Sequence, residues 1–332
     1  MKFALLKMNK GNEKRFQSLI ENYRSSRFED EICLNPLTDL QKYYDDCEKD
    51  PGHRSFKSCE DFRLTDIPVK YRSVELLNLI RTLFILTVKV MVTSISPDRP
   101  REQSLHEIYE ASCGVPPVRF GSGKISKIKE IIGRGKNTCP CKECLKSVSP
   151  KKKWYHIEVI TAKHVVNDAL EAMNTTCTFG YISYACKGQS FSCVGARVSP
   201  NSDWCKLTCV THDEELAAKI KDKICLYDEM SENLYVSYRT SKKNPKLAII
   251  ISHPHGCYKQ ISIGYWRKRA QAGGLDTKYT YTTSTCNGSS GAPVYILGRD
   301  GRLGLCTHIH SGWDPESPLK DNFSCCVFDS IQ

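Results

Sequence analysis

From about Gly114 onward, the sequence is a succession of short apolar runs, each followed by glycine, asparagine, aspartate or proline. Many short strands separated by turn residues are typical of antiparallel β-structure and favour a barrel or a sandwich. One helical stretch, at 213–223, interrupts them. The larger part of the chain is therefore predicted to be all-β. The expected strands span residues 118–128, 154–160, 177–182, 192–198, 204–210, 246–252, 260–266, 279–284, 292–297 and 303–308.

The N-terminal part of the chain has a different pattern. Loose helical spacing predicts short helices over 13–23 and 37–44, and apolar residues at helical intervals predict a buried helix over 69–84. Alternation of apolar and polar residues directly after this helix indicates a strand. We expect residues 1–85 to form a mainly helical extension of unassigned role, ahead of a β-rich domain over 86–332.

Eighteen of the 332 residues are cysteine. Such a content indicates disulfides, metal sites or buried thiols, depending on the compartment. The first ten residues contain an apolar run of only four, too short for a secretory signal, and the most apolar window, 74–92, contains three charged residues. We therefore expect a cytoplasmic protein with no membrane insertion, in which most cysteines are reduced thiols.

Three segments far apart in the sequence carry residues that make chemical sense together. A predicted strand runs into a turn that presents His164, Asp203 opens a later strand, and Ser290 lies between Gly288 and Gly291 just before another strand. Acyl transfer by serine needs a base, an acid that orients the base, and N–H donors for the oxyanion. The N–H groups of Gly288 and Ser290 are the expected oxyanion hole.

Three aspartates are candidates for the acid that orients the histidine. Asp213 opens the predicted helix, so helix capping explains it without catalysis. Asp168 lies only four residues after His164, which is too close for a separate strand. Asp203 is therefore the expected acid.

These motifs resemble those of a known family. Residues 161–166 and 288–294 are similar to the histidine and serine motifs of trypsin-like serine proteases, above all the cytosolic and organellar types without an activation peptide. Residues 251–264 resemble the strand–turn–strand of their second barrel. The stretch 86–326 also resembles uncharacterised invertebrate intracellular trypsin-like proteins, through 96–100, 139–141 and 211–213.

The resemblance implies two six-stranded antiparallel β-barrels, the first at about 114–212 and the second at about 240–328, with the triad in the cleft between them. It also implies the roles: His164 as general base and acid, Asp203 as its orienting acid and Ser290 as nucleophile.

One residue departs from the family pattern. Extracellular trypsins place an aspartate immediately before the nucleophile, where it pairs with the N-terminus freed by zymogen cleavage, whereas this chain has Ser289. Ser289 cannot form that ion pair. We expect a loop that is ordered without proteolytic activation, and whether the oxyanion hole is formed at rest stays open.

The resemblance also indicates a specificity pocket. Its base would lie at Ser284, six residues before Ser290, and its wall on the strand that carries His308 and His310. Ser284 offers no charge to an arginine or lysine side chain, and a histidine in the wall could donate a hydrogen bond to glutamine or glutamate. We expect a preference for these two residues; the alternative is that both histidines are only polar residues of an edge strand.

Cys139, Cys141 and Cys144 place three thiols within six residues. Thiolates on a short loop suit half of a structural zinc site, although the expected catalysis itself requires no cofactor. The alternative is a loop of reduced or occasionally disulfide-bonded cysteines. A fourth zinc ligand would have to be chosen among Cys205, Cys209 and His212.

The formal net charge is +11, and much of it lies in residues 116–174, which include Lys151–Lys153 beside two aromatic residues. Such a patch could bind nucleic acid, but three lysines in a loop are more often solvated, so nucleic-acid binding is not the expected function. The leading hypothesis is a serine endopeptidase that acts on polypeptides. The alternative is a catalytically silent trypsin-fold binding or scaffold protein, and the oligomeric state stays open.

Overall fold

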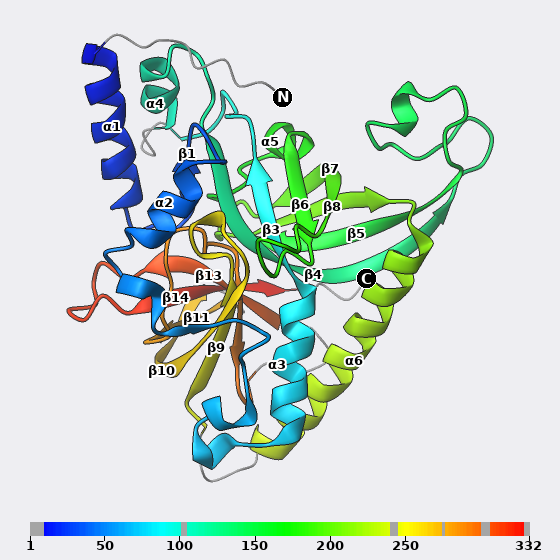
Figure 1. Ribbon diagram of the computed structural model, residues 1–332. Helices are drawn as coiled ribbons and strands as arrows, with labels where there is room; N and C mark the ends of the chain where they lie inside the picture. Colours follow the sequence, from blue (N-terminus) through cyan, green and yellow to red (C-terminus); the bar gives the residue numbers. More distant parts are fainter. Residues whose placement is uncertain (1–9, 101–104, 240–244, 274–275, 300–305, 329–332) are drawn as a thin grey trace.

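The computed structural model describes residues 10–100, 105–239, 245–273, 276–299 and 306–328 (Figure 1). Its first sheet has the strand order β1-β4-β3-β6-β7-β8-β5, and β5 also pairs with β4. Six strands therefore close into an antiparallel barrel, and β1 lies beside the first residues of β4. These strands are β1 (Glu31–Cys33), β3 (Thr87–Val92), β4 (Val118–Ile132), β5 (Lys153–Thr161), β6 (Thr175–Phe179), β7 (Gln189–Val198) and β8 (Cys205–Thr211).

The second sheet closes in the same way. Its order is β11-β14-β13-β12-β9-β10-β2, and β11 also pairs with β10, so that β2 is the added strand. Its strands are β2 (Phe56–Lys57), β9 (Leu247–Ser252), β10 (Gln260–Gly273), β11 (Asp276–Tyr281), β12 (Pro293–Ile296), β13 (Cys306–Trp313) and β14 (Asn322–Phe328). The prediction of two six-stranded antiparallel barrels is confirmed.

The chain enters the first barrel earlier than the range 114–212. Strand β3 precedes Gly114 and pairs with both β4 and β6, so the barrel could not close without it. Strand β14 was not among the expected strands. Its buried residues include Asn322 and Ser324, which are held by hydrogen bonds rather than by apolar packing, and a hydrophobicity pattern does not detect such a strand.

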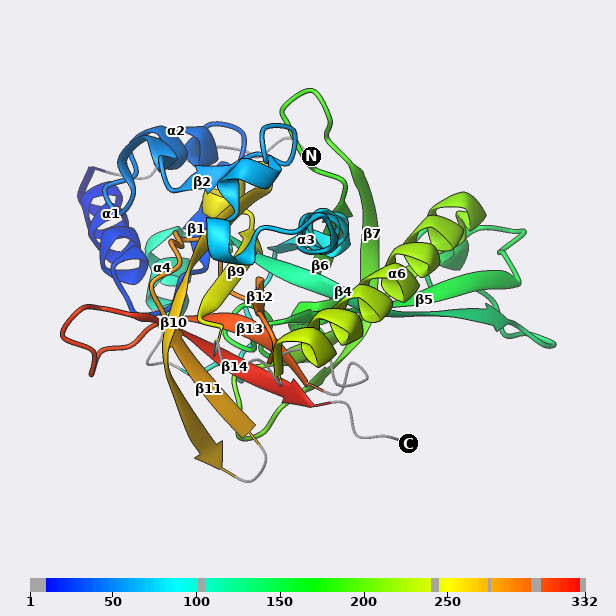
Figure 2. The same cartoon turned by 90° about the horizontal axis from the view of Figure 1, so that it is seen from below.

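Two helices pack against each other beside the barrels, α3 (Val74–Leu86) and α6 (Glu214–Arg239) (Figures 1 and 2). Ser73 caps α3 by accepting a hydrogen bond from the N–H of Leu76 at 3.1 Å. Helix α6 continues well beyond residue 223, where the sequence prediction ended it. That prediction was wrong because the buried stripe continues at helical intervals to Leu234 between many charged residues.

The N-terminal region is helical in α1 (Lys10–Arg24) and α2 (Asp39–Asp45), as predicted, but it is not a separate extension. Its strand β1 joins the first barrel and β2 joins the second. Two further short helices, α4 (Leu105–Ala111) and α5 (Ala169–Met173), had no sequence prediction. Helix α4 packs against α1 at one side of the molecule (Figure 2). In the part of the chain described, no helix is long and apolar enough to cross a membrane.

Candidate active site

His164, Asp203 and Ser290 come together where the two barrels meet. His164 follows β5 and Asp203 precedes β8, its directly paired neighbour, whereas Ser290 precedes β12 of the second barrel. Nδ1 of His164 lies 2.8 Å from Oδ2 of Asp203, and Nε2 lies 2.6 Å from Oγ of Ser290. These contacts have the connectivity that a serine nucleophile, its base and an orienting acid require.

Asp203 is oriented by several donors. The N–H of His164 donates to Oδ1 at 3.0 Å, and the hydroxyl of Ser311 on β13 donates to Oδ2 at 2.6 Å. Burial alone would raise the pKa of Asp203, but His164 and these hydrogen bonds hold it below its ordinary value. A carboxylate in this position accepts a hydrogen bond from Nδ1–H, which leaves Nε2 unprotonated toward Ser290.

The two competing acids lie elsewhere and cap helices. Asp168 accepts a hydrogen bond from the N–H of Glu171 at the start of α5, at 2.9 Å. Asp213 accepts one from the N–H of Leu216 at the start of α6, also at 2.9 Å, which agrees with the capping role predicted for it.

The loop before Ser290 is held by hydrogen bonds from the first barrel. Gly288 and Gly291 have φ angles of +90° and +81°, in the left-handed region that favours glycine. The hydroxyl of Ser122, on β4, donates a hydrogen bond to the carbonyl oxygen of Gly288 at 2.8 Å. The backbone N–H of Ser122 donates to the carbonyl oxygen of Ser290, also at 2.8 Å. Nothing in the sequence around Ser122 indicated this role, because it depends on contact between the barrels.

The N–H groups of Gly288 and Ser290 point to one acceptor, and that acceptor belongs to the N-terminal region. The carbonyl oxygen of Glu29 accepts hydrogen bonds from Gly288 at 2.6 Å and from Ser290 at 3.1 Å. The N–H of Glu29 donates to Oγ of Ser290 at 3.1 Å. A backbone carbonyl therefore occupies the predicted oxyanion hole.

The residues next to Glu29 also lie in the cleft. The ring of Phe28 stacks on that of His164, with centroids 4.4 Å apart. The carbonyl oxygen of Arg27 accepts a hydrogen bond from the N–H of Trp313, on β13, at 3.1 Å. Beyond the cleft, the chain continues into β1. Residues 27–31, which we call the cleft segment, thus lie against His164, Ser290 and Trp313.

The side chain of Glu29 is buried among polar partners, a site that we call the Glu29 pocket. Its Oε2 lies 2.7 Å from Nε2 of His310, its Oε1 pairs with Nζ of Lys49, and only 3% of the side chain is exposed. Lys49 also donates to Oγ1 of Thr285 at 3.1 Å. Burial alone would raise the pKa of Glu29, but Lys49 and His310 hold it well below its ordinary value.

The three pocket residues expected from the sequence have different surroundings. His310 contacts the Glu29 carboxylate, and its Nδ1 lies 2.8 Å from the hydroxyl of Tyr281. His308, two residues earlier on β13, lies near the hydroxyls of Thr277 and Ser324 instead, at 3.4 and 3.2 Å. Ser284 is half-buried, and its carbonyl oxygen accepts a hydrogen bond from Ser262. Sequence reasoning did not find Lys49.

The turn that carries His164 rests on a buried ion cluster. The Glu171 carboxylate pairs with Arg99 and Arg119, at 2.8 Å in each case, and all three side chains are fully buried. Arg99 also donates to the carbonyl oxygens of His164 at 2.9 Å and Val165 at 3.3 Å. Burial alone would raise the pKa of Glu171, but the two arginines hold it at about 2.

The cysteine loop is as compact as its spacing predicted. The Sγ atoms of Cys139, Cys141 and Cys144 lie within 4.8 Å of one another. Of the candidate fourth ligands, His212 is adjacent, with Nε2 3.8 Å from Sγ of Cys141. Cys209 lies against Cys193 and Cys177 instead, and Cys205 is buried in the core of the first barrel.

No family model matches the chain, and no curated protein is significantly similar to it. Among solved structures, the active form of the M. tuberculosis Rv3671c protease is 14% identical over 76% of this chain and 81% of that chain, with a TM-score of 0.38. The inactive form of that protease is 13% identical over 76% of this chain and 89% of that chain, with a TM-score of 0.35. Closeness to invertebrate trypsin-like proteins stays a prediction of the sequence.

The ion cluster leads to a prediction about stability. Glu171→Gln removes one partner of a buried pair, which costs about 3–5 kcal/mol of unfolding free energy because two arginines are left without their counter-charge. The pKa of Glu171 is lower in the folded state than in the unfolded state. Its contribution to the free energy of unfolding is therefore complete above the unfolded-state pKa and is lost as the pH falls toward 2. Chemical denaturation between pH 7 and pH 3 measures both effects.

The control is Glu107→Gln, because Glu107 is an exposed glutamate on α4. We expect the free energy of unfolding of the wild type and of this control to fall over the same acid range. For Glu171→Gln it should be lower at pH 7 and should fall less as the pH drops. Equal stability of the two variants at pH 7 would contradict the role of the cluster.

Proposed function

We propose that this protein is a serine endopeptidase. The observation that carries the proposal is the meeting of His164, Asp203 and Ser290 from two barrels, at 2.8 and 2.6 Å, beside two N–H groups that already bind a peptide carbonyl oxygen. Preorganised donors at that position stabilise the charge that develops on the oxygen in the transition state.

In the proposed reaction, Oγ of Ser290 attacks the scissile carbonyl while Nε2 of His164 takes its proton. Asp203 stabilises the resulting imidazolium and keeps it oriented. The N–H groups of Gly288 and Ser290 hold the oxyanion, and His164 then protonates the leaving amine. Water hydrolyses the acyl-enzyme by the same route, so this chemistry needs no cofactor.

We further propose that the enzyme cleaves after glutamate. The pocket that receives the Glu29 side chain offers an ammonium group, from Lys49, and a ring N–H, from His310. Burial lowers the pKa of His310, and a neutral ring that carries its proton on Nε2 can still donate to the Glu29 carboxylate. Lys49 adds a positive charge, which favours glutamate over glutamine.

The occupied cleft favours a second candidate, a catalytically silent binding or scaffold protein of the same fold. In that case the cleft segment would be a permanent part of the core, and no substrate would reach Ser290. Accessibility of Ser290 to a small reagent distinguishes the two candidates.

Reaction with a fluorophosphonate probe tests this function. Glu29→Ala removes the side chain that anchors the cleft segment, so we expect this variant to be labelled faster than the wild type and Glu29→Ala/Ser290→Ala not to be labelled. Peptide cleavage should fall at least about 10⁴-fold without Ser290. A folded Glu29→Ala protein that resists labelling would favour the silent scaffold.

Cleavage of a peptide library by the Glu29→Ala variant tests the specificity. We expect cleavage after glutamate, and Lys49→Met in that background should lower the preference for glutamate over glutamine by roughly 5- to 30-fold, because one charged contact contributes about 1–2 kcal/mol. Lys57→Met is the matched control, since Lys57 pairs with Asp66 on the surface. Dominant cleavage after arginine or lysine contradicts this specificity.

Three proposals follow the sequence expectations. Cys139, Cys141, Cys144 and the adjacent His212 would hold a structural zinc ion. A reducing, cytoplasmic location is supported by the thiols, since the cysteines whose side chains the structure describes are free. The partner would be a polypeptide rather than nucleic acid, because Lys153 of the basic run pairs with Glu130 and Glu214.

A further inference from the structure

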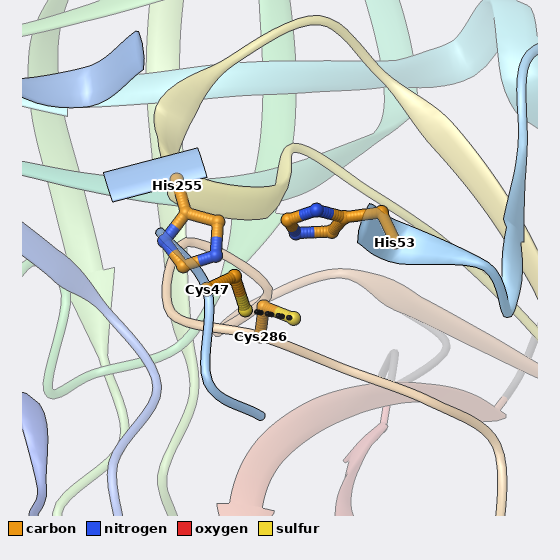
Figure 3. A group of neighbouring side chains, drawn as sticks. All are labelled: Cys47, His53, His255 and Cys286. Carbon is orange, nitrogen blue, oxygen red and sulfur yellow. Dashed lines mark hydrogen bonds between the residues drawn. The ribbon is translucent and has the colours of Figure 1, made fainter. Parts of the chain in front are cut away.

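A cluster of four side chains lies outside the triad. Cys47, His53, His255 and Cys286 point toward one another (Figure 3), all four are buried, and their ligand atoms lie within 4.8 Å of one another. Two of them come from the N-terminal region after α2. The other two come from the second barrel, His255 from the turn after β9 and Cys286 from the turn that leads to Ser290.

The two thiols are spaced like ligands of one ion. Their Sγ atoms are 3.6 Å apart, whereas a disulfide would require about 2.05 Å. Two thiolates on a tetrahedral zinc ion, each about 2.3 Å from the metal, lie about 3.8 Å from each other.

The two histidines have nitrogen atoms that lack protein partners. Both ring nitrogens of His53 and Nε2 of His255 are buried with no hydrogen bond, which is costly for polar atoms. Nδ1 of His255, in contrast, lies 2.8 Å from the carboxylate of Glu31. Zinc-binding histidines are commonly oriented by a carboxylate at the other ring nitrogen.

The backbone gives a separate observation. His53 and His255 have φ angles of +48° and +53°, in the left-handed region that residues other than glycine rarely adopt. Backbone strain of this kind persists where the surroundings fix it, often at functional sites. Both histidines of the cluster are thus held in an unfavourable conformation that aims their rings at the two thiols (Figure 3).

We propose that Cys47, His53, His255 and Cys286 bind a structural zinc ion. Two thiolates and two imidazoles suit zinc rather than calcium or magnesium, and four protein ligands leave no open position for catalysis. The ion would tie the N-terminal region to the loop that precedes Ser290. It would thereby order the loop in a chain where Ser289 cannot form an activating ion pair.

Metal content of purified Ser290→Ala protein, measured by plasma mass spectrometry, tests the site without reference to activity. We expect Cys47→Ser/Cys286→Ser in this background to lose one zinc ion per chain relative to the parent. The matched control is Cys139→Ser/Cys141→Ser, which leaves the four ligands intact and should keep that ion. A folded Cys47→Ser/Cys286→Ser protein with the zinc content of its parent would overturn the proposal.

A second measurement serves if the cysteine variant does not fold. The Cys139→Ser/Cys141→Ser protein is stripped of metal and titrated with zinc while its melting temperature is followed. Binding to the folded state alone raises the melting temperature with zinc concentration. An unchanged melting temperature would exclude the site. With Co²⁺ in place of zinc, the visible spectrum should be that of a tetrahedral site with two thiolates, and an octahedral spectrum would contradict it.

The cleft segment leads independently to another inference, which rests on the proposed function. The Glu29 carbonyl lies in the oxyanion hole, its side chain fills the pocket, and Arg27 and Phe28 contact Trp313 and His164. We infer that the peptide bond between Glu29 and Asp30 is a substrate of Ser290 in the same chain, so that the protein cleaves itself there.

The step is an ordinary acyl transfer. Oγ of Ser290 forms a bond to the Glu29 carbonyl carbon, the bond to the Asp30 nitrogen breaks, and the serine proton passes through His164 to that nitrogen. One water molecule then hydrolyses the ester, which regenerates Ser290 and leaves a carboxylate on Glu29. Lys49 lies after the cleaved bond and would stay in the pocket for other substrates.

Intact-mass analysis of freshly purified protein tests this activity. We expect the wild type to yield a fragment that begins at Asp30, at a rate independent of protein concentration, and Ser290→Ala and Glu29→Arg to stay intact. If Glu29→Ala reacts with the fluorophosphonate but the wild type stays uncleaved, self-cleavage is wrong and the proposed function holds. If folded Glu29→Ala does not react, the proposed function itself fails.

Discussion

The row of hydrogen bonds from Ser311 through Asp203 and His164 to Ser290 joins the two barrels, and much of the structure serves to keep it aligned. Its members come from both barrels, so a small displacement of one barrel relative to the other would break it. Ser122 opposes such a displacement, because it belongs to the first barrel and bonds the loop of the second. Side chains and N–H donors that are fixed in position in this way need no reorganisation when charge develops in a transition state.

The N-terminal region belongs to the same constraint. It adds one strand to each barrel, pairs Lys49 with the Glu29 carboxylate and places Glu29 against Ser290. A buried glutamate is tolerable only where opposite charge and hydrogen bonds offset its desolvation, and Lys49 and His310 provide both. The proposed zinc ion would reinforce this attachment, since its four ligands come equally from the N-terminal region and the second barrel.

The β-rich class and the candidate residues His164, Asp203 and Ser290 were predictable because their signals are local. Strands such as β9 are continuous apolar runs bounded by turn residues, and residues beside Ser290 include the two glycines that its loop conformation requires. Asp203 was separable from Asp213 because capping explains an acid at the start of a helix. Strand β14 and the length of α6 were missed, since buried hydrogen-bonded residues and charged interruptions obscure the apolar pattern.

The sequence by itself thus indicated a β-rich barrel or sandwich, because apolar periodicity acts over a few residues. Its resemblance to a known family added the two barrels and the candidate set His164, Asp203 and Ser290. Only the tertiary structure decided what fills the cleft and what surrounds it. Glu29 and Ser290 are 261 positions apart, and Cys47 and Cys286 are 239 apart. Contacts across such separations produce no spacing pattern in the sequence, because they exist only once both barrels have closed and the N-terminal region has packed against each of them.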